Sequence, residues 1–233
     1  MSDSTANSSV SRRLALAAVP VLAAATLLSA PVILPAGQGL PAAAAAPCPD
    51  IEVVFARGTS EAPGIGRVGQ ALTDALIAQA GGRTVGTYGV VYPATYDFLG
   101  AAAGANDATA HITAMSQQCP GTRIVLGGYS QGAAVIDMLA GIPPLGNKVG
   151  EVGSGPPLPG GLNGNVAGAA VFGNPSAKFG VPLSGSGGFA GKAIDLCADG
   201  DPICSDGRNP FAHTSYERTN MPAQAAGFIV GRL

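Results

Sequence analysis

Residues 124–136 read IVLGGYSQGAAVI, with the pattern Gly-x-Ser-x-Gly in the middle of the stretch. The apolar residues before the pattern predict a buried β-strand, 122–128, and those after it an α-helix, 131–140, so Ser130 lies on the turn between them. Such a turn has strained backbone dihedrals, and side chains two residues before and after the serine would clash there, which glycine avoids. The stretch therefore predicts a nucleophilic serine raised above a sheet at a helix N-terminus, where the helix dipole stabilises negative charge.

The pattern on both sides of this turn alternates between strands and helices. The glycine- and proline-rich segments 143–164 and 174–190 are expected to be loops. Strands that alternate with helices favour a mostly parallel sheet covered on both faces, and right-handed crossovers then give a single α/β three-layer sandwich of about five strands. Further strands are expected at 51–56, 84–92, 166–172 and 192–196, and further helices at 68–79, 100–118 and 222–232.

A serine nucleophile needs a base, because the hydroxyl is a poor nucleophile at its free pKa. The chain has two histidines, His111 and His213. On a sheet with this serine turn, the chain order is serine, then acid, then histidine. We therefore expect His213, in a loop after the last strand, to be the base. His111 precedes the serine and is expected to be a partly exposed residue of a helix.

The acid should lie between the serine and His213. Asp201 precedes Pro202, which favours an extended conformation at the aspartate, so we prefer Asp201 to Asp199. Both aspartates lie between Cys197 and Cys204. A disulfide between these cysteines would hold a carboxylate rigidly against an imidazole. The run Asp-Gly-Asp-Pro also suits a simple turn, which is the alternative explanation for both. The six carboxylates considered are Asp137, Glu151, Asp195, Asp199, Asp201 and Asp206.

The tetrahedral intermediate of a serine nucleophile carries an oxyanion, which needs two N–H donors. The residue after the nucleophile, Gln131, offers its backbone N–H. The second donor is expected in the loop after the first strand, where residues 57–61 read RGTSE. There we expect Gly58 to let the backbone turn and Thr59 to donate its N–H and its hydroxyl.

The first segment of the chain is typical of a targeting sequence. Arg12 and Arg13 precede a long apolar run, and small residues follow at 42–46. We therefore expect residues 1–46 to be a secretory signal peptide with a linker, and residues 47–233 to be one folded domain outside the cell or in its envelope. A retained membrane anchor is the alternative, but three prolines interrupt the apolar run.

The four cysteines all follow this leader. An even number in an exported chain predicts two disulfides, for which three pairings are possible. Cys197 and Cys204 are close in sequence and flank a turn-rich stretch, and pairing them leaves Cys48 with Cys119. No Cys-x-x-Cys pair is present and the histidines are distant, so neither a zinc site nor any other metal or cofactor is predicted.

The composition excludes several classes of protein. Charged residues make up only 11 % of the 233 residues, the net charge is -2, and no run of Lys or Arg occurs. A nucleic acid partner is not expected, because neutralising phosphates needs clustered cations. Hydrophobic residues make up 47 %, which excludes a wholly disordered chain.

Taken together, these motifs resemble the cutinase family, and in particular the cutinase-like serine esterases of actinobacteria, of the mycobacterial type. Several fungal cutinases have a serine where Thr59 stands here. The matching pieces occur in the family's order and span nearly all of the chain after the leader: Cys48, 56–61, Cys119, 128–132, Cys197, Asp201, Cys204 and His213.

The resemblance implies an α/β-hydrolase-like fold and a serine esterase or lipase that cleaves short- to medium-chain esters through an acyl-enzyme. It also implies an ester or lipid substrate. The site residues that it implies are a triad of Ser130, Asp201 and His213, an oxyanion hole of Thr59 and Gln131, and the disulfides Cys48–Cys119 and Cys197–Cys204.

Other functions stay open. The same residues would serve a phospholipase A or an acyltransferase acting on envelope lipids, and a catalytically silent secreted antigen or binding protein is a third possibility. Transient contact with a lipid surface and a monomeric state are expected. The acyl pocket should be apolar, and its candidate wall residues, which ordinary loop packing would also explain, are Phe179, Val181, Leu183, Phe189 and Phe211.

Overall fold

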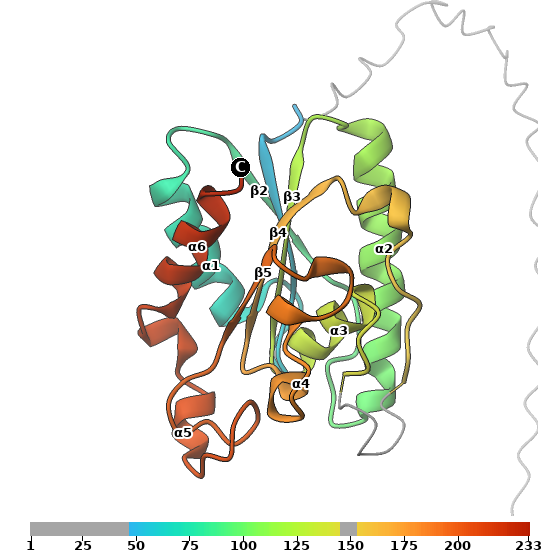
Figure 1. Cartoon of the computed structure of the whole chain (residues 1–233). Coiled ribbons are helices and arrows are strands. Elements are labelled where there is room, and N and C mark those ends of the chain that lie inside the picture. Colours follow the sequence, from blue (N-terminus) through green and yellow to red (C-terminus); the bar gives the residue numbers. More distant parts are fainter. Residues whose placement is uncertain (1–46, 145–152) are drawn as a thin grey trace, which may run out of the picture. The chain divides into compact units, whose positions relative to one another are not determined.

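Five parallel strands form a central sheet in the order β2-β1-β3-β4-β5 (Figure 1). The structure is a computed structural model that describes residues 47–144 and 153–233. The predicted leader and Glu151 lie outside these residues. The strands are β1 Ile51–Ala56, β2 Val85–Gly89, β3 Arg123–Tyr129, β4 Val166–Phe172 and β5 Ala193–Leu196.

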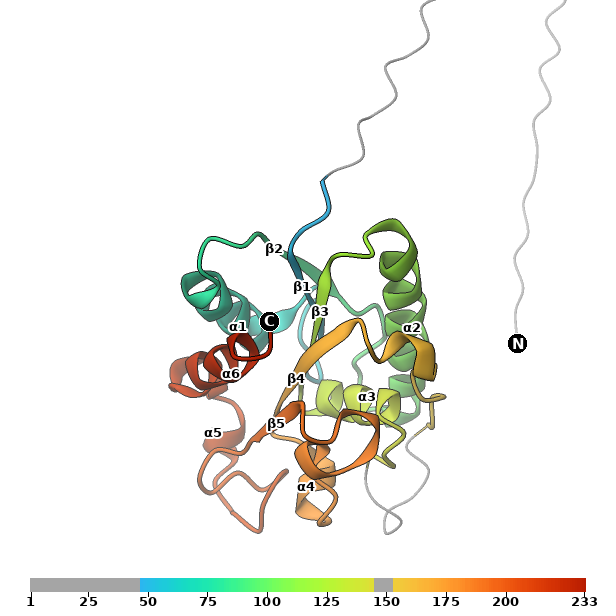
Figure 2. The ribbon, with the colours of Figure 1, turned by 45° about the horizontal axis from the view of Figure 1, so that its top comes forward.

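Helices cover both faces of the sheet (Figures 1 and 2). One face carries α1 (Gly66–Gln79) and α6 (Met221–Val230), and the other carries α2 (Ala101–Gln118) and α3 (Gln131–Leu139). The predicted three-layer α/β sandwich of α/β-hydrolase type is confirmed. The shorter helices are α4 Pro175–Lys178, α5 Pro210–His213, η1 Phe98–Gly100, η3 Gly160–Leu162, η4 Leu183–Gly185, η5 Gly187–Phe189 and η6 Tyr216–Arg218.

Apart from Glu52, the sequence of strand β1 is an apolar run, and the packing of the strand shows why. Val54 and Ala56 pack into the core beneath α2 and α3, whereas Val53 and Phe55 pack into the core beneath α1 and α6. All four side chains are fully buried. A strand covered on both faces has no polar side, so alternation between apolar and polar residues is absent.

Helix α2 packs through alanines rather than large side chains. The predicted face of α2 is fully buried and consists of Ala101, Ala105, Ala108 and Ile112.

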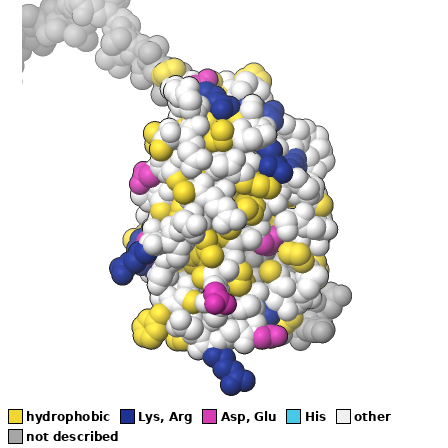
Figure 3. All heavy atoms as spheres, turned by 60° about the vertical axis from the view of Figure 1, so that its left-hand side comes forward, with side chains coloured by type: hydrophobic (Ala, Val, Ile, Leu, Met, Phe, Trp, Pro, Cys, Tyr) yellow, Lys and Arg dark blue, Asp and Glu magenta, His cyan; other side chains and the backbone are white. Residues whose placement is uncertain are grey.

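The outer surface of the domain carries few charges. On the side formed by α1 and α6, scattered charged side chains stand among many uncharged atoms (Figure 3). None of the described helices is both long and apolar enough to cross a bilayer.

Two expectations about the chain between these elements were wrong. Residues 174–190 were expected as a loose loop but form α4, η4 and η5. Asn174 caps α4, and Pro175 occupies its first turn. The Asp195 carboxylate then accepts hydrogen bonds from the next segment, the backbone N–H groups of residues 183 and 184. The strand expected at 84–92 ends at Gly89, because β2 is at the edge of the sheet and its partner β1 ends at the same level.

Candidate active site

Ser130 lies between β3 and α3 with φ 55° and ψ -116°. This left-handed φ costs a non-glycine residue about 1–3 kcal/mol and persists only where its surroundings enforce it. A Cβ on Gly128 would overlap the carbonyl of Gly132, and a Cβ on Gly132 would overlap the carbonyl of Ala56. Only glycine therefore permits this turn.

The Ser130 hydroxyl meets His213, 83 residues away in the sequence. His213 Nε2 is 2.9 Å from Ser130 Oγ, and His213 Nδ1 is 2.7 Å from Asp201 Oδ2. The Asp201 carboxylate is fully buried, whereas the imidazole is 15 % exposed. The three side chains thus form one hydrogen-bonded chain that reaches the surface at the serine and the histidine.

Asp201 is held as an anion. Burial alone would raise the pKa of its carboxyl. The hydrogen bonds that the carboxylate accepts, including one of 2.7 Å from the Ile203 N–H to Oδ1, outweigh burial and hold this pKa below its ordinary value. An ionised carboxylate in this place can orient the imidazole and stabilise its protonated form.

A small disulfide loop supports Asp201. Cys197 and Cys204 are joined, as are Cys48 and Cys119. Inside the small loop, the Asp201 N–H donates to the Ala198 carbonyl, and the Asp201 carbonyl accepts from the hydroxyl of Ser205, the residue after Cys204. The acid is therefore fixed through its backbone as well as through its side chain.

His213 was expected in a loop but is the last residue of the short helix α5. Asn209 caps this helix by accepting from the Phe211 N–H, and Pro210 begins it. Asn followed by Pro is a helix-start signal that the sequence contains. The helix sets the direction in which the imidazole leaves the backbone.

The other titratable candidates lie elsewhere. His111 binds Glu52 at 2.9 Å and stacks on Tyr88, between α2 and the β1–β2 edge of the sheet. Asp199 and Asp206 are exposed. The remaining two described carboxylates share one amide as donor, because Asn174 Nδ2 lies 3.1 Å from Asp137 Oδ1 and 2.9 Å from Asp195 Oδ1.

Thr59 and Gln131 come together beside the serine. The Thr59 hydroxyl donates to Gln131 Oε1 at 3.2 Å. Gln131 is the first residue of α3, so its N–H has no acceptor within the helix. No described residue accepts a hydrogen bond from the Thr59 N–H. Two N–H groups are thus available next to the serine, and the threonine hydroxyl already has a partner.

Gly58 was expected to allow a turn, but its φ is not positive. The structure shows a different need for glycine, because a Cβ at Gly58 would lie 2.5 Å from Cδ1 of Tyr129. The Tyr129 hydroxyl donates to the His213 carbonyl at 2.6 Å, and burial raises the pKa of this phenol to about 12. The missing side chain therefore gives space to a ring that holds the histidine.

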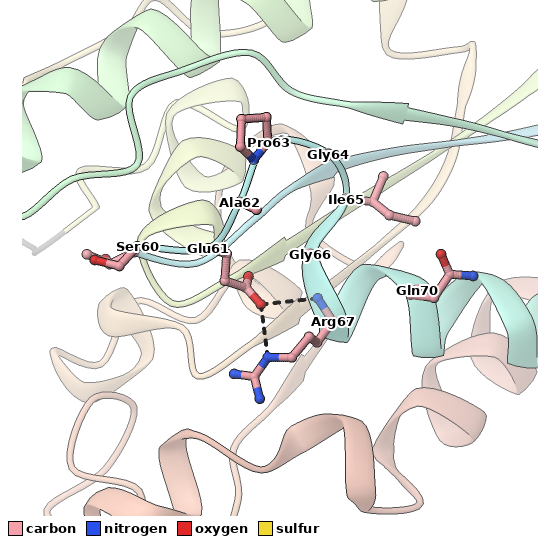
Figure 4. A pocket seen from close by; sticks show the side chains of 10 residues that line it. Ser60, Glu61, Ala62, Pro63, Gly64, Ile65, Gly66, Arg67 and Gln70 are labelled. Carbon is pink, nitrogen blue, oxygen red and sulfur yellow. Dashed lines mark hydrogen bonds and ion pairs between the residues drawn. The ribbon is translucent and has the colours of Figure 1, made fainter.

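Two side chains that sequence reasoning missed, Glu61 and Arg57, hold the loop of Thr59, and Figure 4 shows the contacts of Glu61 with Arg67. Glu61 accepts from the Gly58 N–H at 2.7 Å and from the Arg67 N–H at 3.1 Å. The buried guanidinium of Arg57 donates to the carbonyls of Glu61 and Tyr92. Arg57 and Glu61 are the first and last residues of the motif 57–61. The opposite charges at its two ends are the sequence signal that could have indicated their role in holding the loop.

The same loop lines an open surface hollow of about 810 Å³, bounded by residues 59–67 and Gln70 (Figure 4). The prediction that Leu183 and Phe189 form the wall of the acyl pocket was wrong, because both are fully buried in the core beneath α2 and α3. Phe211, by contrast, is 77 % exposed, two residues before the histidine.

Asp137 gives a stability prediction. Its carboxyl is fully buried on α3, and burial raises its pKa well above the ordinary value. A raised carboxyl pKa stabilises the fold below the unfolded-state value of about 4 and loses this contribution as the pH rises toward the folded-state value. Asp137→Asn should remove this loss, so its melting temperature relative to wild type should increase between pH 4 and pH 9.

The control for Asp137→Asn is Asp74→Asn. Asp74 is exposed on α1 and accepts from Gln70 at 2.8 Å. Its replacement should shift the melting temperature by the same small amount at every pH. Parallel melting-temperature profiles for wild type and Asp137→Asn would contradict a neutral buried acid.

Comparison with known proteins places this geometry in a family. The cutinase family model matches residues 47–233. The chain is 51 % identical over 191 residues to "Phospholipase Culp4" of Mycobacterium tuberculosis (82 % of this chain, 81 % of that protein) and 46 % identical over 199 residues to "Carboxylesterase Culp1" of Mycobacterium bovis (82 % and 85 %).

Among solved structures, a Trichoderma reesei cutinase in complex with a phosphonate inhibitor is 34 % identical, with a TM-score of 0.64 over 79 % of this chain and 77 % of that one. The family match covers the whole described domain, and the alignments with both sequence relatives cover most of the length of those proteins. The chain therefore belongs to the cutinase family and is a carboxylic-ester hydrolase.

Proposed function

We propose that Ser130 is the nucleophile, His213 the general base and Asp201 the orienting acid of this ester hydrolase. The observation that carries the assignment is the continuous hydrogen-bonded chain from Ser130 Oγ through the imidazole to the buried carboxylate, with bonds of 2.9 and 2.7 Å. Both distances are within the range needed for proton transfer and for orienting the base.

In the acylation step, His213 Nε2 takes the hydroxyl proton of Ser130 while Oγ forms a bond to the ester carbonyl carbon. The carbonyl oxygen becomes an oxyanion, which the N–H groups of Thr59 and Gln131 stabilise. The intermediate then collapses, the bond to the alcohol oxygen breaks, and the imidazolium returns the proton to the leaving alcohol.

In the deacylation step, water replaces the alcohol. His213 removes a proton from the water, the resulting hydroxide attacks the acyl carbon, and the acid product leaves as Ser130 regains its proton. The N–H groups that stabilised the first oxyanion stabilise the second. If an alcohol enters in place of water, the same steps transfer the acyl group to that alcohol.

The substrate is proposed to be an ester with an apolar acyl chain presented at a lipid surface, including phospholipids. Five large hydrophobic side chains are exposed on the segments that follow β2 and β5, and the four beyond Val91 are proposed to form a rim. Strands of a parallel sheet end at the same edge, so these segments lie on the side of the sheet that carries Ser130. The rim residues are Tyr96 (78 % exposed), Phe98 (44 %), Leu99 (55 %) and Phe211 (77 %). The phospholipase name of one relative supports the same substrate class.

An acyl-chain series separates the candidate functions. Purified residues 47–233 would be given p-nitrophenyl esters of increasing chain length, phosphatidylcholine vesicles, and each ester with an added alcohol. Hydrolysis of short and medium esters is expected, with water as the acceptor. Labelling of Ser130 by an organophosphonate, located by peptide mass, should accompany it. A chain that hydrolyses none of these esters and takes no label would be a silent binding protein.

The hydrophobic rim gives a prediction of its own. Leu99→Ser/Phe211→Ser should bind phosphatidylcholine vesicles at least tenfold more weakly, because burying each side chain contributes about 2 kcal/mol. Hydrolysis of vesicle lipids should fall in proportion, and hydrolysis of a soluble acetate ester should fall far less. Ile77→Ser, which removes an exposed hydrophobic residue from α1, is the matched control and should change neither. Equal losses on vesicle and soluble substrates would contradict the rim's role.

Export is part of the proposal. The two disulfides support it, because disulfides persist mainly in oxidising compartments. We propose that residues 1–46 are removed as a signal peptide with its linker and that the domain from residue 47 onward acts outside the cytoplasm. N-terminal sequencing of the protein recovered from culture medium and envelope fractions tests both points, and an intact N-terminus in the cytoplasm would contradict them.

A further inference from the structure

Tyr216, in η6, lies three residues after His213 and is fully buried. Its hydroxyl donates to Asp201 Oδ2 at 2.6 Å and accepts from the Ala198 N–H at 2.9 Å. The same hydroxyl is 3.4 Å from Cys204 Sγ. One phenol oxygen thus touches the acid and two points of the small disulfide loop.

The carboxylate oxygen that accepts the hydrogen bond of the phenol is also the one that accepts the hydrogen bond of the imidazole. Asp201 Oδ2 accepts from Tyr216 at 2.6 Å and from His213 Nδ1 at 2.7 Å, whereas Oδ1 accepts from the Ile203 N–H. Two donors therefore compete for the electron density of a single carboxylate oxygen. A strong donor at this oxygen reduces the stabilisation that the carboxylate gives to a protonated imidazole.

We propose that Tyr216 is a positioning residue that fixes the Asp201 carboxylate and tunes the hydrogen bond between its Oδ2 and His213. The proposal rests on the triad assigned above and adds a fourth member, which acts through the acid and does not touch the substrate. It predicts two separable effects of the hydroxyl, one on geometry and one on the pH at which the enzyme becomes active.

The charges around Tyr216 are compatible with this role. Burial raises the pKa of its phenol, and the hydrogen bond to Asp201 raises it further, so the hydroxyl stays protonated. Tyr129 of β3 packs edge-on against its ring. The other charged side chains near this group of rings, which act on the phenol of Tyr129, are Glu61 of the β1–α1 loop, Arg67 of α1 and Glu217 of η6.

The main test is Tyr216→Phe, which removes the hydroxyl and keeps the ring that packs edge-on against Phe172 and His213. The acid limb of the kcat/KM profile for a soluble ester should move up by about half a pH unit, because the carboxylate then stabilises the imidazolium more strongly. The plateau kcat should fall roughly tenfold, since a misplaced catalytic group is costly.

The matched control is Tyr88→Phe. The Tyr88 hydroxyl also binds a carboxylate, at 3.0 Å from Asp107 Oδ2, but between β2 and α2. Its loss should leave the pH profile and the plateau unchanged. A purely structural role for Tyr216 would lower the melting temperature of Tyr216→Phe without moving the acid limb, and that result would overturn the proposal.

Site-specific replacement of Tyr216 by 3-fluorotyrosine gives the opposite test and covers failure of Tyr216→Phe to fold. Fluorination makes the phenol a stronger donor, so the acid limb should move down. Movement in the same direction as in Tyr216→Phe, or no movement, would overturn the proposal. Organophosphonate labelling separates the two levels of inference, because an unlabelled wild-type Ser130 would overturn the triad and this proposal together. Normal labelling with an unmoved acid limb would overturn only the role of Tyr216.

Discussion

Ser130→Ala is expected to reduce kcat for ester hydrolysis by about 10⁶-fold, the loss typical of serine triads when the nucleophile is removed. His213 Nε2 has Ser130 Oγ as its hydrogen-bond partner. When this hydroxyl is removed, the imidazole has no nucleophile in place to activate. The measurement is steady-state hydrolysis of a soluble p-nitrophenyl ester by a preparation free of contaminating esterase. Retention of more than a few per cent of the activity would contradict the assignment of the nucleophile.

Replacing Ser130 by glycine should abolish activity but increase the stability of the fold. Ser130 has a φ of 55°, which glycine adopts without strain. Ser130→Gly should therefore be as inactive as Ser130→Ala but melt at a higher temperature than either the alanine variant or wild type. This pair of variants distinguishes a residue kept in strain for its chemistry from one that merely fills a turn.

The two histidines provide a matched comparison for the base. His213→Ala should be inactive because, among the described residues, the His213 imidazole alone has a hydrogen bond to Ser130 Oγ. His111→Ala removes a 2.9 Å contact with Glu52 and a stacking contact with Tyr88, so it should lower the melting temperature and leave kcat unchanged. Loss of activity in the His111 variant and not in the His213 variant would reverse the assignment.

The sequence was most informative where one residue type has one physical use. Gly128 and Gly132 surround a serine whose turn tolerates no Cβ at either place, so the turn between strand and helix was predictable. The apolar runs of β1 and β4 predicted strands for a similar reason, since every residue of both strands is buried. Alternation of strands and helices then left few arrangements other than the observed sandwich.

The remainder depends on contacts between distant segments. Tyr216 carries no sequence signal, because its role comes from Asp201, 15 residues earlier in the chain. Gly58 was interpreted as a turn residue, although a ring from β3 requires the space. Segment 174–190 looked like a loop, although Asn174 and Pro175 begin a helix there, because a carboxylate on β5, Asp195, supplies the contacts that order the part after that helix. Such dependence appears only once the sheet has formed.

Cys197→Ser/Cys204→Ser should lower kcat by about 10²-fold while changing the melting temperature modestly. The bridge closes a loop with a sequence separation of 7, and Asp201 lies inside it. A carboxylate displaced by about 1 Å no longer orients the imidazole, and errors of this size cost about 10²-fold in rate. In the loop-entropy model, so short a loop contributes only about 2.5 kcal/mol to stability.

The control is the other bridge. Cys48–Cys119 has a sequence separation of 71 and should contribute about 4 kcal/mol in the same model. Cys48→Ser/Cys119→Ser should therefore melt at the lower temperature of the two double variants, with kcat nearly kept in the folded fraction. Folding would be checked by circular dichroism and the active fraction counted by organophosphonate labelling. Equal losses of kcat would show that neither bridge is specific to the acid. Loss confined to the small loop would mean that its disulfide acts on catalysis through Asp201, the residue that it encloses.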